Sequence, residues 1–202
     1  RNNMYQLYQK SHNWLDQTRA ADFLGPLILR LYLAPVFWIA GTNKLADMDS
    51  VITWFGNDDW GLGLPVPAFF AWAAVLTEVL GVILLVVGFA VRWISIPLMI
   101  TMLVAMFAVH WPNGWQAVAD PMSAFAGSDV AESIRRLDIA RDILKEHGNY
   151  SWLTEKGSLV VSNNGIEWAF TYFAMCLVLF FNGAGGYASV DYYLAKKFKA
   201  PD

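Results

Sequence analysis

The sequence predicts an all-α fold: an integral membrane four-helix bundle with an extra amphipathic helix in a long outer loop. Three observations predict it. Of the 202 residues, 56% are hydrophobic and only 15% are charged, with a mean hydropathy of +0.37. The apolar residues gather in runs near the roughly 20 residues that a helix needs to cross a bilayer core. A long polar segment separates the last of these runs from the others.

Four apolar segments predict the four helices. They cover residues 23–42, 66–91, 93–110 and 166–183. Arg92 stands alone between the second and third segments, so these two form a tight helical hairpin. Four crossings place both ends of the chain on one side of the membrane. We therefore interpret residues 1–202 as a single membrane domain.

The distribution of basic residues orients this bundle. The side that holds both tails carries seven Lys and Arg residues, and the other side carries six over much longer loops. Positive charge close to the membrane ends favours the cytoplasmic side, so we expect both termini in the cytoplasm. The first twenty residues are polar and lack the apolar core of a secretory signal, so we expect no cleaved signal there.

Both outer loops contain helical patterns. Residues 48–55 predict a short interfacial helix. In the insertion 112–164, apolar residues recur at nearly helical spacing: Val130, Ile134, Leu137 and Leu144. Ser128 is suited to begin a helix and Gly148 to end one. We predict an amphipathic helix over 129–147, lying on the outer face of the membrane.

Two charged residues lie within the apolar segments. Arg30 is about a third of the way along the first helix, and Glu78 lies near the middle of the second. Each costs about 2.5–3.5 kcal/mol to insert, so each requires a reason. One interpretation is a buried Arg30–Glu78 pair, or a protonated Glu78, that holds the bundle together. The other is a polar pocket for a quinone or a proton.

Three further polar residues fall at the outer ends of three helices. Lys44 ends the first helix, His110 ends the third and Glu167 opens the fourth. They form a candidate outer site, where a quinone head group, a metal or a redox partner docks. The alternative interpretation is separate contacts with lipid head groups by long side chains.

The residue content argues against several cofactors and partners. A haem often needs two axial His ligands, and beyond His110 only His12 and His147 remain. The single cysteine, Cys176, forms neither a disulfide nor a thiolate zinc site within the chain. We find no flavin or nicotinamide fingerprint and expect no metal. The net charge of −3 does not favour nucleic acid.

Four short segments together resemble a known family. They are RLYLAPVFWIAGTNKL (30–45), TEVLGVILLVVGFAVRW (77–93), MLVAMFAVHW (102–111) and NGAGGYASVDYYL (182–194). In this order they resemble the four membrane helices of the DoxX family, here with a longer insertion at 112–164. The second segment has the acidic residue before a glycine and the Arg at the turn. The third ends in His.

The resemblance implies a four-helix protein of the bacterial inner membrane that is tied to redox chemistry. Related proteins serve as the membrane subunit of thiosulfate:quinone oxidoreductase or accompany thiol and oxidative-stress enzymes. The matching polar residues are Arg30, Lys44, Glu78, Arg92, His110, Glu167 and Asp191. An inner-end motif follows from the same resemblance: Arg92, Gly183, Gly185, Tyr187 and Asp191.

Three functions are compatible with these features. The first is a membrane subunit of a redox system, quinone-linked and partnered with thiol, sulfur or metal-related oxidoreductase chemistry. Quinone is then the expected cofactor, and a partner protein supplies the electrons. The second is a non-enzymatic membrane anchor or assembly factor for a partner complex. The third is a transporter or channel, for which four helices require a homo-oligomer.

Overall fold

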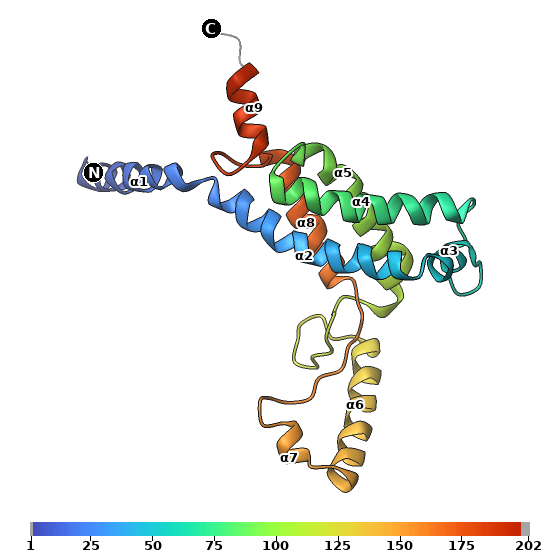
Figure 1. The fold of residues 1–202 in the computed structure, drawn as a ribbon. Helices are drawn as coiled ribbons and strands as arrows, with labels where there is room; N and C mark the ends of the chain where they lie inside the picture. Colours follow the sequence, from blue (N-terminus) through green and yellow to red (C-terminus); the bar gives the residue numbers. More distant parts are fainter. Residues whose placement is uncertain (1, 199–202) are drawn as a thin grey trace. The chain divides into compact units, whose positions relative to one another are not determined.

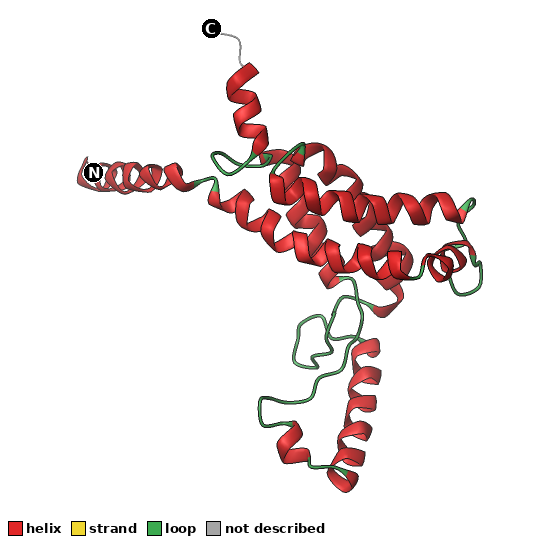
Figure 2. Ribbon diagram, viewed as in Figure 1, coloured by secondary structure: helices red, strands yellow, loops and turns green. Residues whose placement is uncertain are grey.

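The computed structural model describes residues 2–198, and these are almost entirely helical (Figure 2). Among them no strand forms, and one isolated antiparallel bridge joins Val118 and Ser162. The predicted all-α class is confirmed. Arg1, Lys199 and Asp202, on which the charge count and topology prediction draw, lie outside the described residues.

The described part of the chain forms two compact units. Residues 2–99 and 174–198 make up unit 1, and residues 100–173 make up unit 2. Two helices run from one unit into the other: α5 (Val91–Val104) and α8 (Glu167–Asn182). Each unit is described separately below.

Three helical stretches have the length and composition of membrane spans. They are α2 (Leu24–Ala46, 23 residues), α4 (Pro67–Val87, 21 residues) and the continuous stretch Val91–Asn113 (23 residues). In the last of these, α5 passes into a π-helical segment, η2 (Ala105–His110), and a 3₁₀ turn, η3 (Trp111–Asn113). At about 1.5 Å per residue, each stretch is long enough to cross the bilayer core. The protein is therefore a membrane protein.

The fourth apolar segment forms a shorter helix. α8 has 16 residues, which corresponds to about 24 Å of helix. This length falls short of the roughly 30 Å bilayer core unless flanking residues contribute. The helix exists where the sequence predicts it, and its crossing of the membrane stays a prediction.

In unit 1, α2 packs antiparallel against α4 (Figure 1). Leu33 and Phe37 of α2 and Val75 and Leu85 of α4 are almost completely buried. The short helix α3 (Met48–Gly56) also packs on α4, and its N-cap is Asp47, whose carboxylate accepts a hydrogen bond from the Ser50 N–H. The expected short helix over 48–55 is therefore present.

One end of unit 1 is closed by the turn between α4 and α5, and we call it the hairpin end. Gly88 ends α4 with φ +71°, a left-handed conformation that glycine adopts without strain. The loop 183–189 and the start of α9 (Val190–Phe198) lie at the same end, because the Asp191 N–H donates to the Gly88 carbonyl.

Unit 2 contains the predicted amphipathic helix. α6 (Ser128–His147) nearly coincides with the predicted range 129–147, and Val130 and Leu137 form its buried face. The short helix α7 (Tyr150–Leu153) follows it. Backbone hydrogen bonds, such as Ala119 N–H to Val161 O, join the two loops that flank these helices.

The chain begins with a helix that the sequence analysis did not predict. α1 (Asn2–Gln17) is followed by a single 3₁₀ turn, η1 (Thr18–Ala21), and then by α2 (Figure 1).

Candidate functional site

A buried ion pair joins α2 and α4. The Lys44 Nζ donates to both carboxylate oxygens of Glu78, at 2.7 Å each. The Glu78 side chain is only 4% exposed, whereas that of Lys44 is 30% exposed. The ammonium group therefore links a carboxylate in the interior of unit 1 to its surface.

The packing of the two helices explains why this pair forms. Gly41 precedes Lys44 by almost one helical turn and faces α4. A Cβ atom at Gly41 would lie 2.9 Å from the Val79 Cγ2 and 3.1 Å from the Glu78 Cβ. Because glycine has no Cβ, α2 approaches α4 closely enough for Lys44 to reach Glu78.

The pair corrects one of the two interpretations of Arg30 and Glu78. We expected Arg30 as the ionic partner of Glu78, and the structure gives Lys44 that place. An ionised carboxylate in an apolar interior is very costly unless a partner neutralises it. Lys44 provides that neutralisation. Arg30 and Glu78 thus have different partners, and a quinone or proton site at these residues stays a prediction.

Arg30 lies at the hairpin end. Its side chain is completely buried, and its Nη2 donates to the Ala188 carbonyl at 2.7 Å. A Cβ at Gly88 would overlap the Arg30 Nη1, so the glycine leaves room for the guanidinium group. Within residues 2–198, the Arg30 Nε and Nη1 atoms have no hydrogen-bond partner.

Asp191 fastens α9 to the start of α5. Its two carboxylate oxygens accept hydrogen bonds from the Ala90 N–H at 2.8 Å and the Val91 N–H at 3.1 Å. These N–H groups belong to the first turn of a helix and have no intrahelical acceptor. Asp191 therefore caps α5 from a distant part of the chain.

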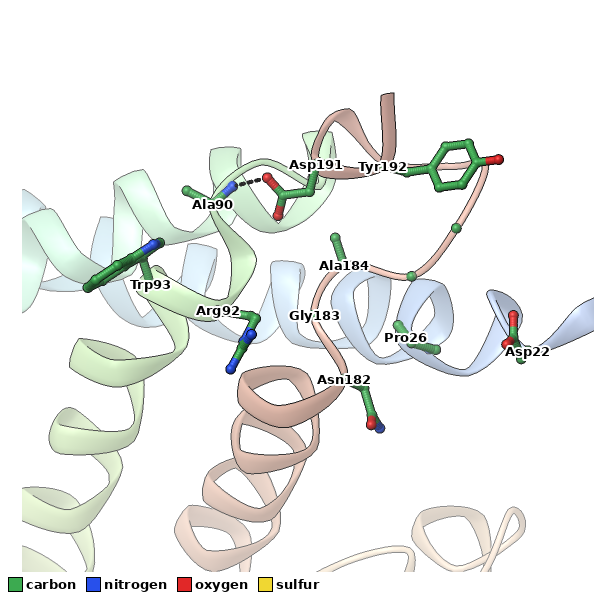
Figure 3. A pocket seen from close by; sticks show the side chains of 12 residues that line it. Asp22, Pro26, Ala90, Arg92, Trp93, Asn182, Gly183, Ala184, Asp191 and Tyr192 are labelled. Atoms are coloured by element: carbon green, nitrogen blue, oxygen red, sulfur yellow. Dashed lines mark hydrogen bonds between the residues drawn. The ribbon is translucent and has the colours of Figure 1, made fainter. Parts of the chain in front are cut away.

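A hollow of about 780 Å³ opens at the hairpin end (Figure 3). Four residues of the predicted inner-end motif line it: Arg92, Gly183, Gly185 and Asp191. The Arg92 Nε donates to the Phe180 carbonyl at 2.8 Å, which fixes the side chain beside the end of α8. Tyr187, the fifth member, packs its ring against that of Phe23, with centroids 5.6 Å apart.

The other two residues of the candidate outer site lie in unit 2. The His110 Nδ1 is 2.9 Å from the Asn164 carbonyl, and a Glu167 oxygen accepts a hydrogen bond from the Ala117 N–H at 2.9 Å. Both side chains thus bind loop backbone. Lys44 belongs to unit 1, so a site shared by Lys44, His110 and Glu167 stays a prediction.

Comparison with known proteins identifies part of the chain. The family model DoxX matches residues 25–111. The chain is similar to the DoxX family over these residues, and we call this range the DoxX domain. The domain contains Arg30, Lys44, Glu78 and His110, whereas Glu167 lies beyond the matched range.

One curated relative is similar over much of this domain. It is described as "Putative oxidoreductase CatD" from Bacillus subtilis (strain 168), and it is 29% identical over 86 residues. The match covers 43% of this chain and 60% of the relative, so it compares parts of the two proteins. No solved structure matches the chain.

Sequence reasoning found the charged residues of the DoxX domain but not all of their partners. Arg30 and Glu78 were predicted to be important because they are charged residues within apolar segments. The Ala188 carbonyl, which Arg30 contacts, is backbone and gives no signal in a sequence. Gly41 is a weak signal, because a glycine near the end of a membrane helix, one turn before a lysine, is compatible with close packing.

Among residues 2–198, no cluster of three or more His, Cys, Asp and Glu side chains is arranged to hold a metal ion. The single cysteine, Cys176, is buried within α8. Quinone stays a prediction.

Proposed function

We propose that this protein is a membrane component of an oxidoreductase system and exchanges protons with a quinone at the Lys44–Glu78 pair. The observation that carries the proposal is a buried carboxylate held by a partly exposed ammonium group in the DoxX domain. Paired ionisable groups inside membrane helices mark proton relays and substrate pathways. The name of the Bacillus subtilis relative supports a connection with oxidoreductases.

The pair has the chemistry that quinone reduction needs. A quinone becomes a quinol by taking up two electrons and two protons. In this proposal the partner oxidoreductase supplies the electrons. Proton transfer from the Lys44 ammonium to Glu78 turns the ion pair into a neutral pair without changing the total charge. Glu78 is then able to give a proton to the reduced quinone, and Lys44, which is 30% exposed, recovers one from the surface. A second passage through the same pair delivers the second proton.

Binding of decyl-ubiquinone to the full-length protein in lipid nanodiscs tests the proposal. Empty nanodiscs correct for partition of the quinone into lipid. We expect saturable binding by the wild type and at least about tenfold weaker binding by Glu78→Gln, equivalent to about 1.4 kcal/mol. Arg135→Met is the matched control, since it breaks an exposed ion pair with Glu132 on α6. Absence of saturable binding by the wild type would overturn the proposal.

A second measurement addresses the proton itself. Infrared difference spectra recorded on quinone reduction should contain a carboxyl band that disappears in Glu78→Gln. A spectrum unchanged by this substitution would show that Glu78 takes no part in proton exchange.

The anchor or assembly role is favoured by a different feature. Unit 2 presents α6, a 20-residue polar helix on which Ile139 and Ile143, one turn apart, are both more than half exposed. Such a surface suits contact with a partner protein. This role predicts no saturable quinone binding by the wild type and no effect of Glu78→Gln on it.

A further inference from the structure

The N-terminal helix α1 has two faces of different character. On a helical projection, Met4, Leu7, Tyr8, Ser11, Trp14 and Leu15 fall within an arc of about 120°. We call this set the apolar stripe. The opposite face carries mostly polar side chains, with Tyr5 at its edge: Gln6, Gln9, Asn13, Asp16 and Gln17. This spacing is typical of an amphipathic helix that places one face in an apolar environment.

Nothing in the described part of the chain covers the stripe. Its five large side chains are between 53% and 78% exposed. A stripe of this size on a water-facing helix would be an unusual surface for a soluble protein. It therefore requires a partner from outside the described residues.

The position of α1 in the chain points to lipid as that partner. Only residues 18–23 separate the end of α1 from α2, which is itself a membrane span. Six residues reach at most about 20 Å, so α1 cannot leave the neighbourhood of the bilayer surface. The outer surface of α2 near this junction is also apolar and exposed, with Leu24, Ile28 and Leu31.

The stripe consists of residue types that are typical of the boundary between lipid head groups and acyl chains. Tyr8 and Trp14 flank the aliphatic residues of the stripe, and aromatic rings of this kind concentrate at that boundary. The charges on α1 are few: Lys10 and Asp16, with Asp16 already paired to Arg19. Apolar burial rather than attraction to anionic lipid therefore provides the driving force.

We propose that α1 lies in the plane of the membrane surface, with the apolar stripe buried at the boundary between head groups and acyl chains. The surface of the lipid bilayer is its binding partner. The helix then anchors the end of the chain beside the first span and leaves the polar face, centred on Gln9 and Asn13, toward water.

Spin labels placed on the two faces test this directly. In the full-length protein with Cys176→Ala, single cysteines at Leu7 and Leu15 probe the stripe, and those at Gln9 and Asn13 probe the polar face. Each labelled protein is placed in phosphatidylcholine nanodiscs. Collisions with dissolved oxygen report exposure to lipid, and collisions with a water-soluble nickel chelate report exposure to water.

We expect the oxygen-to-nickel accessibility ratio to be high at positions 7 and 15 and low at 9 and 13. Adding phosphatidylglycerol or raising the salt concentration should leave this pattern unchanged, because few charges are involved. High nickel accessibility on both faces would show a helix in water. Immobile labels at 7 and 15 that neither reagent reaches would show a protein partner or a second copy of the chain. Either result overturns the proposal.

Discussion

At the scale of single residues, the choice of partner for Glu78 follows from the register of two helices. Arg30 and Lys44 are fourteen residues apart on α2, which corresponds to about 21 Å along the axis. Antiparallel packing places Gly41 beside Val79 and Arg30 beside Gly88, ten residues beyond Glu78. Depth estimates from sequence place Arg30 and Glu78 roughly within reach of each other, but they contain no information on this register.

The energetic consequence of the ion pair is open to measurement. Lys44→Met leaves a buried carboxylate without its partner, so we expect a loss of about 3–5 kcal/mol in the free energy of unfolding. Glu78→Gln should also destabilise, because it leaves the ammonium group beside a neutral amide. The double variant Lys44→Met/Glu78→Gln should lose less than the sum of the two single variants. Reversible unfolding in mixed micelles provides these values.

Arg135→Met is again a suitable control for this cycle. The Arg135–Glu132 pair is exposed on α6, where water screens both charges, so we expect no measurable change in unfolding. If the effects of Lys44→Met and Glu78→Gln are simply additive, the two groups do not interact in the membrane and the observed ion pair has no energetic role.

At the scale of helices, length and periodicity carry most of the information. The apolar runs predict the three long spans to within a few residues, because the thickness of the bilayer sets their length. The spacing of Val130 and Leu137 likewise predicts α6. α1 was not predicted, because a polar face made mostly of Gln and Asn rather than charged residues gives a weak amphipathic pattern.

Close contacts between helices were less predictable than the helices themselves. Whether a glycine faces a neighbouring helix depends on register, and register depends on many side chains at once. Gly41 and Gly81 look alike in the sequence, yet they meet different neighbours. A Cβ at Gly41 would meet the branched Val79 side chain and the Glu78 Cβ, whereas one at Gly81 would lie 3.2 Å from the end of Leu98.

This difference predicts an order of stability for two alanine variants. Gly41→Ala should destabilise by about 1–3 kcal/mol, since Val79 and the Cβ of Glu78 are stiff and α2 must move away from α4. Gly81→Ala should cost less, because the Leu98 side chain rotates away and alanine favours the helix. Thermal unfolding of both variants in the same detergent provides the comparison. A Gly81→Ala variant as unstable as Gly41→Ala would contradict this account of the α2–α4 contact.

At the scale of the whole molecule, the structure bears on how many times the chain crosses the membrane. Within unit 1, the loop that follows α8 lies beside the start of α2, since a Cβ at Gly185 would be 3.2 Å from the Phe23 carbonyl oxygen. Arg30 of α2 also contacts Ala188 of the same loop. The first span thus begins at the end of unit 1 where α8 ends. This arrangement favours an even number of crossings, with α8 as the fourth despite its 16 residues.

The number of crossings and the positions of the basic residues together predict which side of the membrane each part of the chain faces. Arg92 at the hairpin end and Lys196 and Lys197 of α9 are near the membrane ends on one side, so this side should face the cytoplasm. A reporter fused after the last residue of the chain should therefore read cytoplasmic, and one inserted near Gly127 in unit 2 should read periplasmic. Truncation just before Glu167, with the reporter at the new end, should move the signal to the periplasm, because only the three long spans then remain. If the signal stays cytoplasmic after this truncation, α8 does not cross the membrane. If both full-length fusions read the other way round, the charges have been assigned to the wrong side.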